Sequence, residues 1–345
     1  MIAGRTSSSG SAGGLARHVP VLLPEMLEHL AVVEGGRYID GTFGGGGYSR
    51  AILERGGQVL AIDRDPTARE AGAGLAAEAG GRLKLVEGRF SDLDAHAQAA
   101  GFAPVDGVVL DVGVSSMQLD EAERGFSFRL DGPLDMRMGR SGADAATLVN
   151  QASARDLAAI IRIYGEERKA GRIARAIERA RAEEPILRTA RLAAIIASAV
   201  GPAGASRIHP ATRTFQALRI FINRELEELA RALGAAEAVL RDGGRLVVVA
   251  FHSLEDRVVK RFLQERSQVT RGSRHQPLAH SEPPTFTLPT RGAIEPGEAE
   301  VEANPRARSA RLRAAIRTAA PGRALDFAAL GVPQLHDVPG PEAYQ

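Results

Sequence analysis

Asp40-Gly41-Thr42-Phe43-Gly44-Gly45-Gly46-Gly47 separates a short predicted strand, Arg37–Asp40, from a predicted helix, Tyr48–Arg55. Glycines at such a junction let the backbone approach a ligand closely and adopt dihedral angles closed to other residues. Asp63 follows about twenty residues beyond the start of the loop, at the end of the next predicted strand, where an acid can accept hydrogen bonds from both hydroxyls of a ribose. This stretch therefore predicts an adenosine-binding site in an α/β protein.

The chemistry of the loop favours S-adenosylmethionine over a nicotinamide dinucleotide. A dinucleotide site needs the spacing G-x-G-x-x-G and a helix N-terminus facing a pyrophosphate, but Tyr48 and Ser49 stand where the last glycine would fall if the pattern began at Gly44. The acid at the loop entrance, Asp40, suits a ligand that carries an ammonium and a sulfonium. No Lys-Ser or Lys-Thr follows the glycines, which argues against a P-loop. A nicotinamide cofactor and a glycine turn without a ligand remain the alternatives.

Strands and helices alternate around this loop, which predicts a doubly wound, mostly parallel sheet. A short amphipathic helix, Leu23–Val32, precedes the first strand. The further predicted elements are strands at Gln58–Ile62, Leu83–Val86 and Val105–Leu110, and helices at Pro66–Ala79 and Ser91–Ala100.

The alternation stops between Gly125 and Arg213, where we expect helices over Asp156–Ala182 and Thr189–Val200 but no buried strand. It resumes with a helix, Phe215–Leu240, and a strand, Arg245–Phe251. The sequence therefore predicts a helical domain inserted between two halves of one sheet, followed by a loop and an edge hairpin within residues 267–304. The expected boundaries are a disordered tail at 1–17, a discontinuous methyltransferase domain at 18–124 and 214–320, a helical substrate-recognition insertion at 125–213, and a C-terminal tail at 321–345.

The chain contains no cysteine. This excludes disulfides, Cys-ligated iron–sulfur clusters and a thiolate nucleophile. A methyltransferase of this composition cannot attack a pyrimidine carbon covalently through a thiolate, nor use radical chemistry at a Cys-ligated cluster. Direct transfer to a nitrogen or oxygen remains, and no metal site is predicted.

No apolar run reaches the roughly 18–20 residues of a membrane span, and the best candidate, Leu192–Val200, has about half that length. The Ser- and Gly-rich residues 4–14 lack the apolar region of a signal peptide. We therefore expect a cytoplasmic protein without a membrane partner.

Asp111 stands at the carboxyl end of the fourth predicted strand, the edge where open α/β sheets bind ligands. Methyl transfer to an exocyclic amine requires in-line alignment and an acceptor that holds the amine. Asp111 is the catalytic candidate; it could instead hold the cofactor or cap the following turn. Phe90 could pack against an adenine or belong to the core. His252 ends the later strand at the same edge and is a second catalytic candidate, with a structural role as the alternative.

Two groups of arginines are candidates for contact with RNA phosphates. The net charge of +2 is by itself a weak sign of a nucleic-acid partner. Six arginines from Arg306 to Arg323 lie in a stretch without acids, which makes it the better candidate. The other group recurs at helical spacing on one face, where pairing with glutamates such as Glu178 is the alternative. Its members are Arg168, Arg172, Arg175 and Arg179.

Eight stretches, in order, resemble the bacterial small-subunit ribosomal RNA (cytosine-N4)-methyltransferases, the methyltransferase H family. The resemblance covers the chain from His18 to about Arg317. The stretches are His18-Val19-Pro20-Val21-Leu22, Asp40-Gly41-Thr42-Phe43-Gly44, Ala61-Ile62-Asp63-Arg64-Asp65-Pro66, Leu110-Asp111-Val112-Gly113-Val114-Ser115-Ser116, Glu123-Arg124-Gly125-Phe126-Ser127-Phe128, Asp135-Met136-Arg137-Met138, Phe251-His252-Ser253-Leu254-Glu255-Asp256-Arg257 and Asn304-Pro305-Arg306-Ala307-Arg308-Ser309.

The resemblance implies a Rossmann-like class I methyltransferase sheet interrupted by a helical domain. It implies S-adenosylmethionine-dependent methylation of N4 of a cytosine in the decoding centre of 16S rRNA, with the 30S subunit as partner. The chain departs from the family at Tyr48, commonly His, and at Gly45, often Arg. The implied cofactor contacts are Gly46, Gly47, Tyr48, Asp63, Phe90, Asp111 and Gln118.

Two other classes of function remain open on the same fold. One is a nucleotide-dependent oxidoreductase, which would bind a nicotinamide dinucleotide. The other is a ribosome assembly factor that has lost catalysis, against which the acids at Asp40, Asp63 and Asp111 argue.

Overall fold

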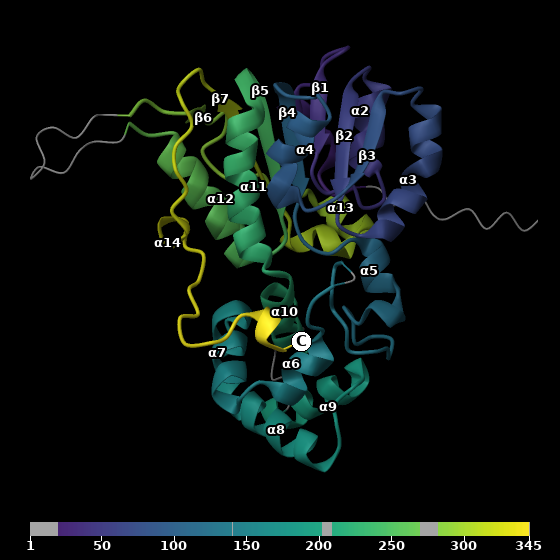
Figure 1. The fold of residues 1–345 in the computed structure, drawn as a ribbon, viewed down its shortest axis with the longest axis vertical. Coiled ribbons are helices and arrows are strands. Elements are labelled where there is room, and N and C mark those ends of the chain that lie inside the picture. The colour runs from purple at the N-terminus through teal and green to yellow at the C-terminus, as the bar shows by residue number, and fades with distance from the viewer. Residues whose placement is uncertain (1–19, 140, 202–208, 270–281, 345) are drawn as a thin grey trace, which may run out of the picture.

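The computed structural model describes residues 20–139, 141–201, 209–269 and 282–344. The predicted tail at 1–17 lies outside these residues. Figure 1 shows a sheet covered by helices in the upper part of the molecule and a group of helices in the lower part. Within the described residues, no helix combines the length and the apolar character that crossing a bilayer requires.

The described residues form a seven-stranded sheet of order β3-β2-β1-β4-β5-β7-β6. The first five strands in the chain run parallel, and β7 lies antiparallel between β5 and β6. This confirms the predicted fold class, a Rossmann-like class I methyltransferase sheet. The order reverses between β1 and β4, and ligands bind at the carboxyl ends of the strands at such a point. The strands are β1 (Arg37–Asp40), β2 (Gln58–Asp63), β3 (Leu83–Glu87), β4 (Val105–Asp111), β5 (Leu240–Ala250), β6 (Phe286–Thr287) and β7 (Arg311–Arg317).

Helices cover both faces of the sheet because its central strands are apolar on both sides. In β4, Val108 and Leu110 belong to one buried cluster and Val109 to the other, as the alternation of side chains along a strand requires. The face of Val109 is packed with residues of α1 (Leu23–Leu30), α2 (Gly47–Glu54) and α3 (Pro66–Glu78). The opposite face is packed with residues of α4 (Leu93–Ala99), α11 (Glu225–Val239) and α12 (Ser253–Arg266).

The lower part is helical, as predicted, although one expected helix is broken. Its helices are α6 (Ala145–Gln151), α7 (Ala154–Gly165), α8 (Ala170–Glu183), α9 (Thr189–Val200) and α10 (Thr212–Asn223). The prediction of one helix over Asp156–Ala182 is wrong. Glu166 ends α7 in the left-handed conformation, with φ +49°, and α8 then packs back along α7. The prediction of a helix at Thr189–Val200 is confirmed.

The helix predicted over Phe215–Leu240 is also two helices, because Arg224 adopts a left-handed φ of +51° between α10 and α11. Asn223 stabilises this break. Its side-chain amide donates to the carbonyl of Met136 and accepts from the N–H of Met138, 2.8 Å away in each case. The break therefore ties α10 to the loop that enters the helical part.

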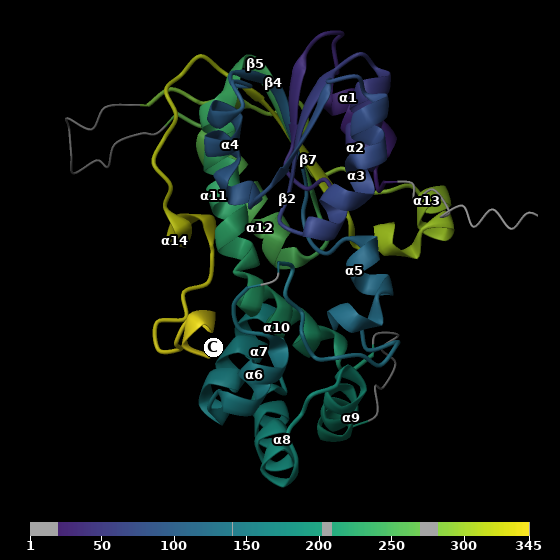
Figure 2. The ribbon, with the colours of Figure 1, turned by 45° about the vertical axis from the view of Figure 1, so that its right-hand side comes forward.

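Shorter elements connect the two parts. In Figure 2, α5 (Ser116–Asp120) lies between the sheet and the helical part. Of the edge hairpin predicted within residues 267–304, the described residues contain only β6, and its partner β7 lies beyond that range; residues 270–281 are outside the described chain. A helix that was not predicted, α13 (Glu298–Ala303), precedes β7.

The C-terminal segment, expected as a tail from residue 321, packs on both parts. Leu330, Val332 and Tyr344 are buried. The short helix α14 (Phe327–Leu330) contacts α11 and α12, and the 3₁₀ turn Pro341–Tyr344 lies against α6. In Figure 1 this segment is the yellow ribbon that descends along the left side of the molecule.

Candidate cofactor and catalytic site

The glycine loop is held to the end of β2 by hydrogen bonds. The N–H of Gly44, at φ +50°, donates to Oδ2 of Asp63 at 2.8 Å, and the N–H of Phe43 donates to the carbonyl of Ile62. A Cβ built on Gly45 meets no heavy atom within 4 Å. The loop is thus fixed at one side and open at Gly45, as a backbone that receives a ligand must be.

Asp63, the predicted ribose-binding acid, accepts hydrogen bonds from the backbone on both sides. Besides the bond from Gly44, its Oδ1 atom accepts from the N–H of Asp65 at 2.9 Å. Each carboxylate oxygen has two lone pairs, so each can accept one further hydrogen bond. Burial raises the pKa of Asp63, and the two backbone donors partly oppose that rise. The remaining acceptor positions therefore suit two hydroxyls that donate from a ribose.

Asp40 accepts hydrogen bonds from the glycine loop and from α2. Its buried carboxylate accepts from the hydroxyl of Ser49 at 2.7 Å and from the N–H of Thr42 at 3.1 Å. Burial raises its pKa to about 6 despite these bonds. Asp40 therefore joins the loop to α2 and contributes negative charge beneath it.

Asp111 has the least satisfied carboxyl of this edge. Its backbone N–H donates to Oγ1 of Thr42 at 2.6 Å, but its side-chain Oδ1 is buried without a hydrogen-bond partner in the described chain. Burial raises its pKa to about 8, and the nearby acids Asp40 and Glu255 add to the effect. A buried acceptor without a partner costs free energy unless a ligand satisfies it. Together with Asp63, this atom makes the edge suitable for a cationic adenosine ligand.

Tyr48 faces away from the open side of the loop. Its ring is buried, and its hydroxyl donates to the carbonyl of Val21. Burial raises the pKa of this phenol well above its ordinary value. A Cβ on Gly47 would lie 2.2 Å from the ring of Pro20, so residues 20–22 cover the start of α2. A ligand could therefore contact this stretch, Gly46 included, through the backbone.

Gln118 hydrogen-bonds to Asp65, an acid after β2 that the sequence analysis did not single out. Its amide donates to Oδ2 of Asp65 at 3.0 Å, and Arg124 pairs with the same carboxylate. These contacts lower the pKa of Asp65 although burial opposes them. Phe90 follows β3, and its Cβ is 3.4 Å from a Cβ built on Gly41, so it lies beside the loop. Asp65 and Arg124 lie within stretches quoted for the family resemblance, which is the signal that could have found them.

His252 lies at the end of β5, on the edge that holds Asp111, but both of its ring nitrogens face Glu255. Nδ1 accepts from the N–H of Glu255 at 3.4 Å, and Nε2 is 2.9 Å from Glu255 Oε1 without a well-aligned hydrogen bond. The other carboxylate oxygen accepts from the N–H groups of Phe251 and His252, at 2.8 and 3.1 Å. Glu255 therefore fixes the turn between β5 and α12.

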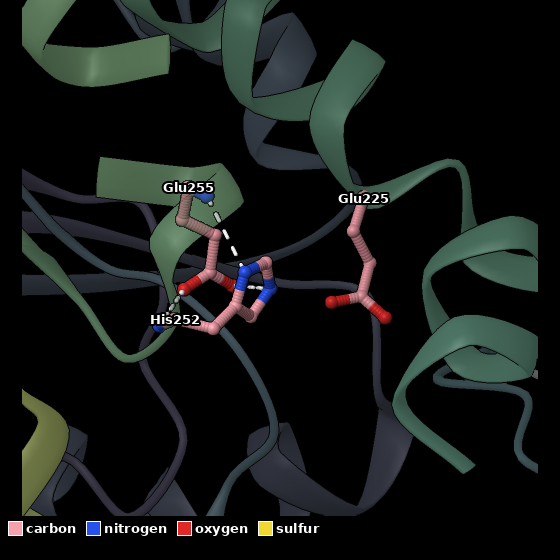
Figure 3. Close-up of side chains that lie close together, drawn as sticks. All are labelled: Glu225, His252 and Glu255. Atoms are coloured by element: carbon pink, nitrogen blue, oxygen red, sulfur yellow. Dashed lines mark hydrogen bonds and ion pairs between the residues drawn. The ribbon is translucent and has the colours of Figure 1, made fainter. Parts of the chain in front are cut away.

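A buried arginine completes this group of charges. Arg219 of α10 donates through Nε and Nη2 to the two carboxylate oxygens of Glu225, 2.7 Å away in each case, and Nη2 is 3.9 Å from Glu255 Oε1. In Figure 3 the ring of His252 lies between the two carboxylates. Potential ligand atoms of Glu225, His252 and Glu255 lie within 4.8 Å of one another, a spacing that suits a metal ion. Because the guanidinium occupies both oxygens of Glu225, a cation would have to displace it, and we assign no metal here.

The two arginine groups differ from their predicted ranking. The arginines of the α8 group, Arg168, Arg172, Arg175 and Arg179, are all exposed, and none has an ion pair within the described residues. The expected alternative, pairing with Glu178, is not seen there. Most of the C-terminal group is instead occupied: Arg311 and Arg313 pair with Asp256, Arg306 pairs with Asp120, and Arg317 and Arg323 donate to backbone carbonyls. The α8 group is therefore the better candidate for phosphate contact.

Comparison with known proteins gives a consistent result. Residues 15–318 match the model of the MraW methylase family. A ribosomal RNA small subunit methyltransferase H from Mesorhizobium japonicum is 58% identical over 331 residues, which cover 96% of this chain and 96% of that protein. A protein of the same name from Azorhizobium caulinodans is 61% identical over 312 residues, 90% of each chain.

Proposed function

We propose, because this chain belongs to the MraW methylase family, that it methylates the exocyclic N4 amine of a cytosine in the decoding centre of 16S rRNA. The chain is an S-adenosylmethionine-dependent methyltransferase. The names of its relatives support small-subunit rRNA as the substrate. The target base, the acceptor atom and the roles of individual residues are the further content of the proposal.

The cofactor would be held at the reversal point of the sheet. When bound, S-adenosylmethionine supplies a methyl group activated by a positively charged sulfur. Asp63 would accept hydrogen bonds from the ribose hydroxyls, and the backbone from Gly46 to Tyr48 would contact the ligand, with Phe90 beside the adenine. Gln118 would act through Asp65, whose carboxylate it holds at 3.0 Å. The negative charge of Asp40 suits a cationic ligand, and such a ligand would favour the ionised form of Asp111.

The buried, unpartnered Oδ1 of Asp111 is the observation that carries the catalytic proposal. An oxygen at this edge can accept an N–H of the cytosine amine and so direct the nitrogen lone pair toward the methyl group. The chain has no cysteine, so we propose no covalent enzyme intermediate: the methyl group would pass directly to the nitrogen, which would release one amine proton. Asp111 is thus the proposed catalytic residue.

His252 stays in the proposal with a narrower role. Both of its ring nitrogens face Glu255, and Nε2 is buried. A ring in this position supports the catalytic edge without touching the base. We therefore propose His252 as a positioning residue.

The RNA would be gripped by the helical part. Arg168 and the three exposed arginines of α8 have no ion pair with any described residue and offer four charges for phosphate binding. A base in paired RNA must be unstacked before its amine can reach a methyl donor. The proposed substrate is therefore an assembled or partly assembled 30S subunit.

One experiment tests the proposed substrate and acceptor atom. The enzyme is incubated with labelled S-adenosylmethionine and with 30S subunits that lack the modification, and nucleosides are separated by mass spectrometry. We expect the label in N4-methylcytosine. Label in any other nucleoside, or none in RNA, would reject the assignment of the base.

A further inference from the structure

A buried ionic group joins the helical part to the catalytic edge. It consists of Arg219, Glu225, Glu255 and His252, which come from α10, the start of α11 and the turn from β5 into α12. Arg219 has 16% of its side chain exposed, Glu225 has 5% and Glu255 none. None of these residues is among the proposed cofactor contacts, so their cost in desolvation requires a separate reason.

The contacts form a continuous chain from the start of α11, through Arg219 and Glu255, to the end of β5. Glu225 is the first residue of α11, directly after the break at Arg224, and both of its oxygens are held by Arg219. The same guanidinium is 3.9 Å from Glu255 Oε1. Glu255 in turn accepts the N–H groups of Phe251 and His252. The helix break is thereby connected to the backbone that ends β5.

Glu255 also borders the proposed reaction site. Its Oε1 atom is 3.9 Å from a Cβ built on Gly113, two residues after Asp111. It is one of the charges that raise the pKa of Asp111. Burial alone would raise the pKa of Glu255 as well, but the proximity of His252 and Arg219 outweighs it, so the carboxyl is held below its ordinary value. A charge at this position therefore depends first on His252 and also on Arg219.

The two hydrogen bonds to Glu225 would by themselves satisfy much of the hydrogen-bonding capacity of the Arg219 guanidinium. Two carboxylates share one arginine here, so the loss of Arg219 would leave both of them buried without their full counter-charge. Because one of the two fixes the backbone next to Asp111, the consequence reaches the reaction site. An arginine that served only to join α10 to α11 would pair with Glu225 and would not lie near Glu255.

We propose that Arg219 is a positioning residue for methyl transfer, which holds the Glu255 carboxylate against the end of β5 and so ties the alignment of the catalytic edge to α10. The inference rests on the proposed function, since it needs Asp111 to act at this edge. It makes catalysis depend on a residue of the helical part that contacts neither the cofactor nor the base. Small misalignments are costly in such a reaction, since about 1 Å can reduce the rate by two orders of magnitude.

The test uses paired substitutions in the full-length protein. The double variant R219Q/E225Q removes one positive and one negative charge together, which leaves the local net charge unchanged and preserves polar partners. We expect kcat for 30S methylation to fall by at least about tenfold, with the dissociation constant of S-adenosylmethionine within about twofold of the wild type. R219K keeps the positive charge and should recover a large part of kcat. The melting temperature of R219Q/E225Q is measured as well, because loss of a structural role would lower it.

A matched control removes an exposed pair in the same way. R155Q/D337N acts on side chains that are 80% and 79% exposed, and should leave kcat unchanged. Wild-type kcat in R219Q/E225Q would overturn the inference, as would a loss of cofactor affinity as large as the loss of kcat, or an R219K variant whose kcat is no higher than that of R219Q/E225Q. Failure of the proposed function is distinguishable, because then the wild-type enzyme itself would give no N4-methylcytosine.

Discussion

The backbone N–H of Asp111 donates a hydrogen bond to the Thr42 hydroxyl oxygen at 2.6 Å, which joins the end of β4 to the glycine loop after β1. The bond crosses the point where the strand order reverses. It fixes the backbone of the proposed catalytic residue relative to the loop that would bind the cofactor. Thr42 therefore positions both halves of the site.

Thr42→Val should disconnect these halves. Valine is close to threonine in shape but leaves the N–H of Asp111 without its acceptor, which costs about 1–3 kcal/mol in the free energy of unfolding. We expect kcat to fall by about tenfold, measured with 30S subunits. Thr42→Ser keeps the hydroxyl and serves as the control. Equal kcat values for the Val and Ser variants would contradict this role.

Asp63→Ala should weaken cofactor binding. The variant loses the predicted ribose acceptor and also the anchor for the N–H groups of Gly44 and Asp65. Removing hydrogen bonds to a charged acceptor costs about 1.5–3 kcal/mol, or roughly 10- to 150-fold in affinity. Calorimetric titration with S-adenosylhomocysteine measures this directly. An Asp63→Ala enzyme with wild-type affinity and rate would remove the ribose assignment.

Binding of S-adenosylmethionine should release a proton below pH 8. The pKa of Asp111 is raised to about 8, so its carboxyl is mostly protonated below that pH and ionises above it. A cationic ligand beside it favours the charged form and lowers this pKa. Affinity should therefore increase as the pH rises toward 8 and then level off. Calorimetry in buffers of different ionisation enthalpy counts the released protons.

Two controls separate this linkage from other ionisations. S-adenosylhomocysteine lacks the sulfonium charge and should release fewer protons. Asp111→Asn cannot ionise at this position, so its binding should lose the pH dependence. If the Asn variant released as many protons as the wild type, another group would be responsible.

Neutralising the exposed face of α8 should weaken RNA binding without affecting the cofactor. The variant changes Arg168, Arg172, Arg175 and Arg179 to Gln. Each phosphate contact that is lost reduces the slope of log affinity against log salt by about 0.7–0.9. Binding to 30S subunits is measured over a range of salt concentrations. Substitution of Arg308, an exposed member of the C-terminal group, is the comparison, and a larger effect there would restore the ranking that the sequence suggested.

The sheet and the cofactor loop could be predicted because their signals are local. Asp63 and Asp111 follow apolar strands directly, and parallel strands place their carboxyl ends at one edge. The breaks at Glu166 and Arg224 could not be predicted in this way, because a charged residue adopts the left-handed conformation at both. Gly165 precedes the first break but is itself the last residue of α7, and no glycine or proline lies beside Arg224. They depend on contacts formed only in the folded chain, such as those of Asn223.

The partners of charged residues were the other feature beyond reach. The C-terminal arginines resemble a phosphate-binding stretch in sequence, but Arg313 pairs with Asp256, 57 residues away. Glu255 lies in a stretch quoted for the family resemblance, yet nothing local shows that it would face both His252 and Arg219. Pairing over such distances is a property of the fold, and the sequence alone ranks such residues by composition.

The packed C-terminal segment has a consequence for the proposed binding of RNA. Arg266 in α12 donates to the carbonyls of Arg323 and Ala324, and Tyr344 is buried at the far end beside the helical part. Contacts with both parts restrain their movement relative to each other before RNA binds. Under the proposed function we therefore expect binding to cost less conformational entropy than it would for two parts joined by flexible linkers.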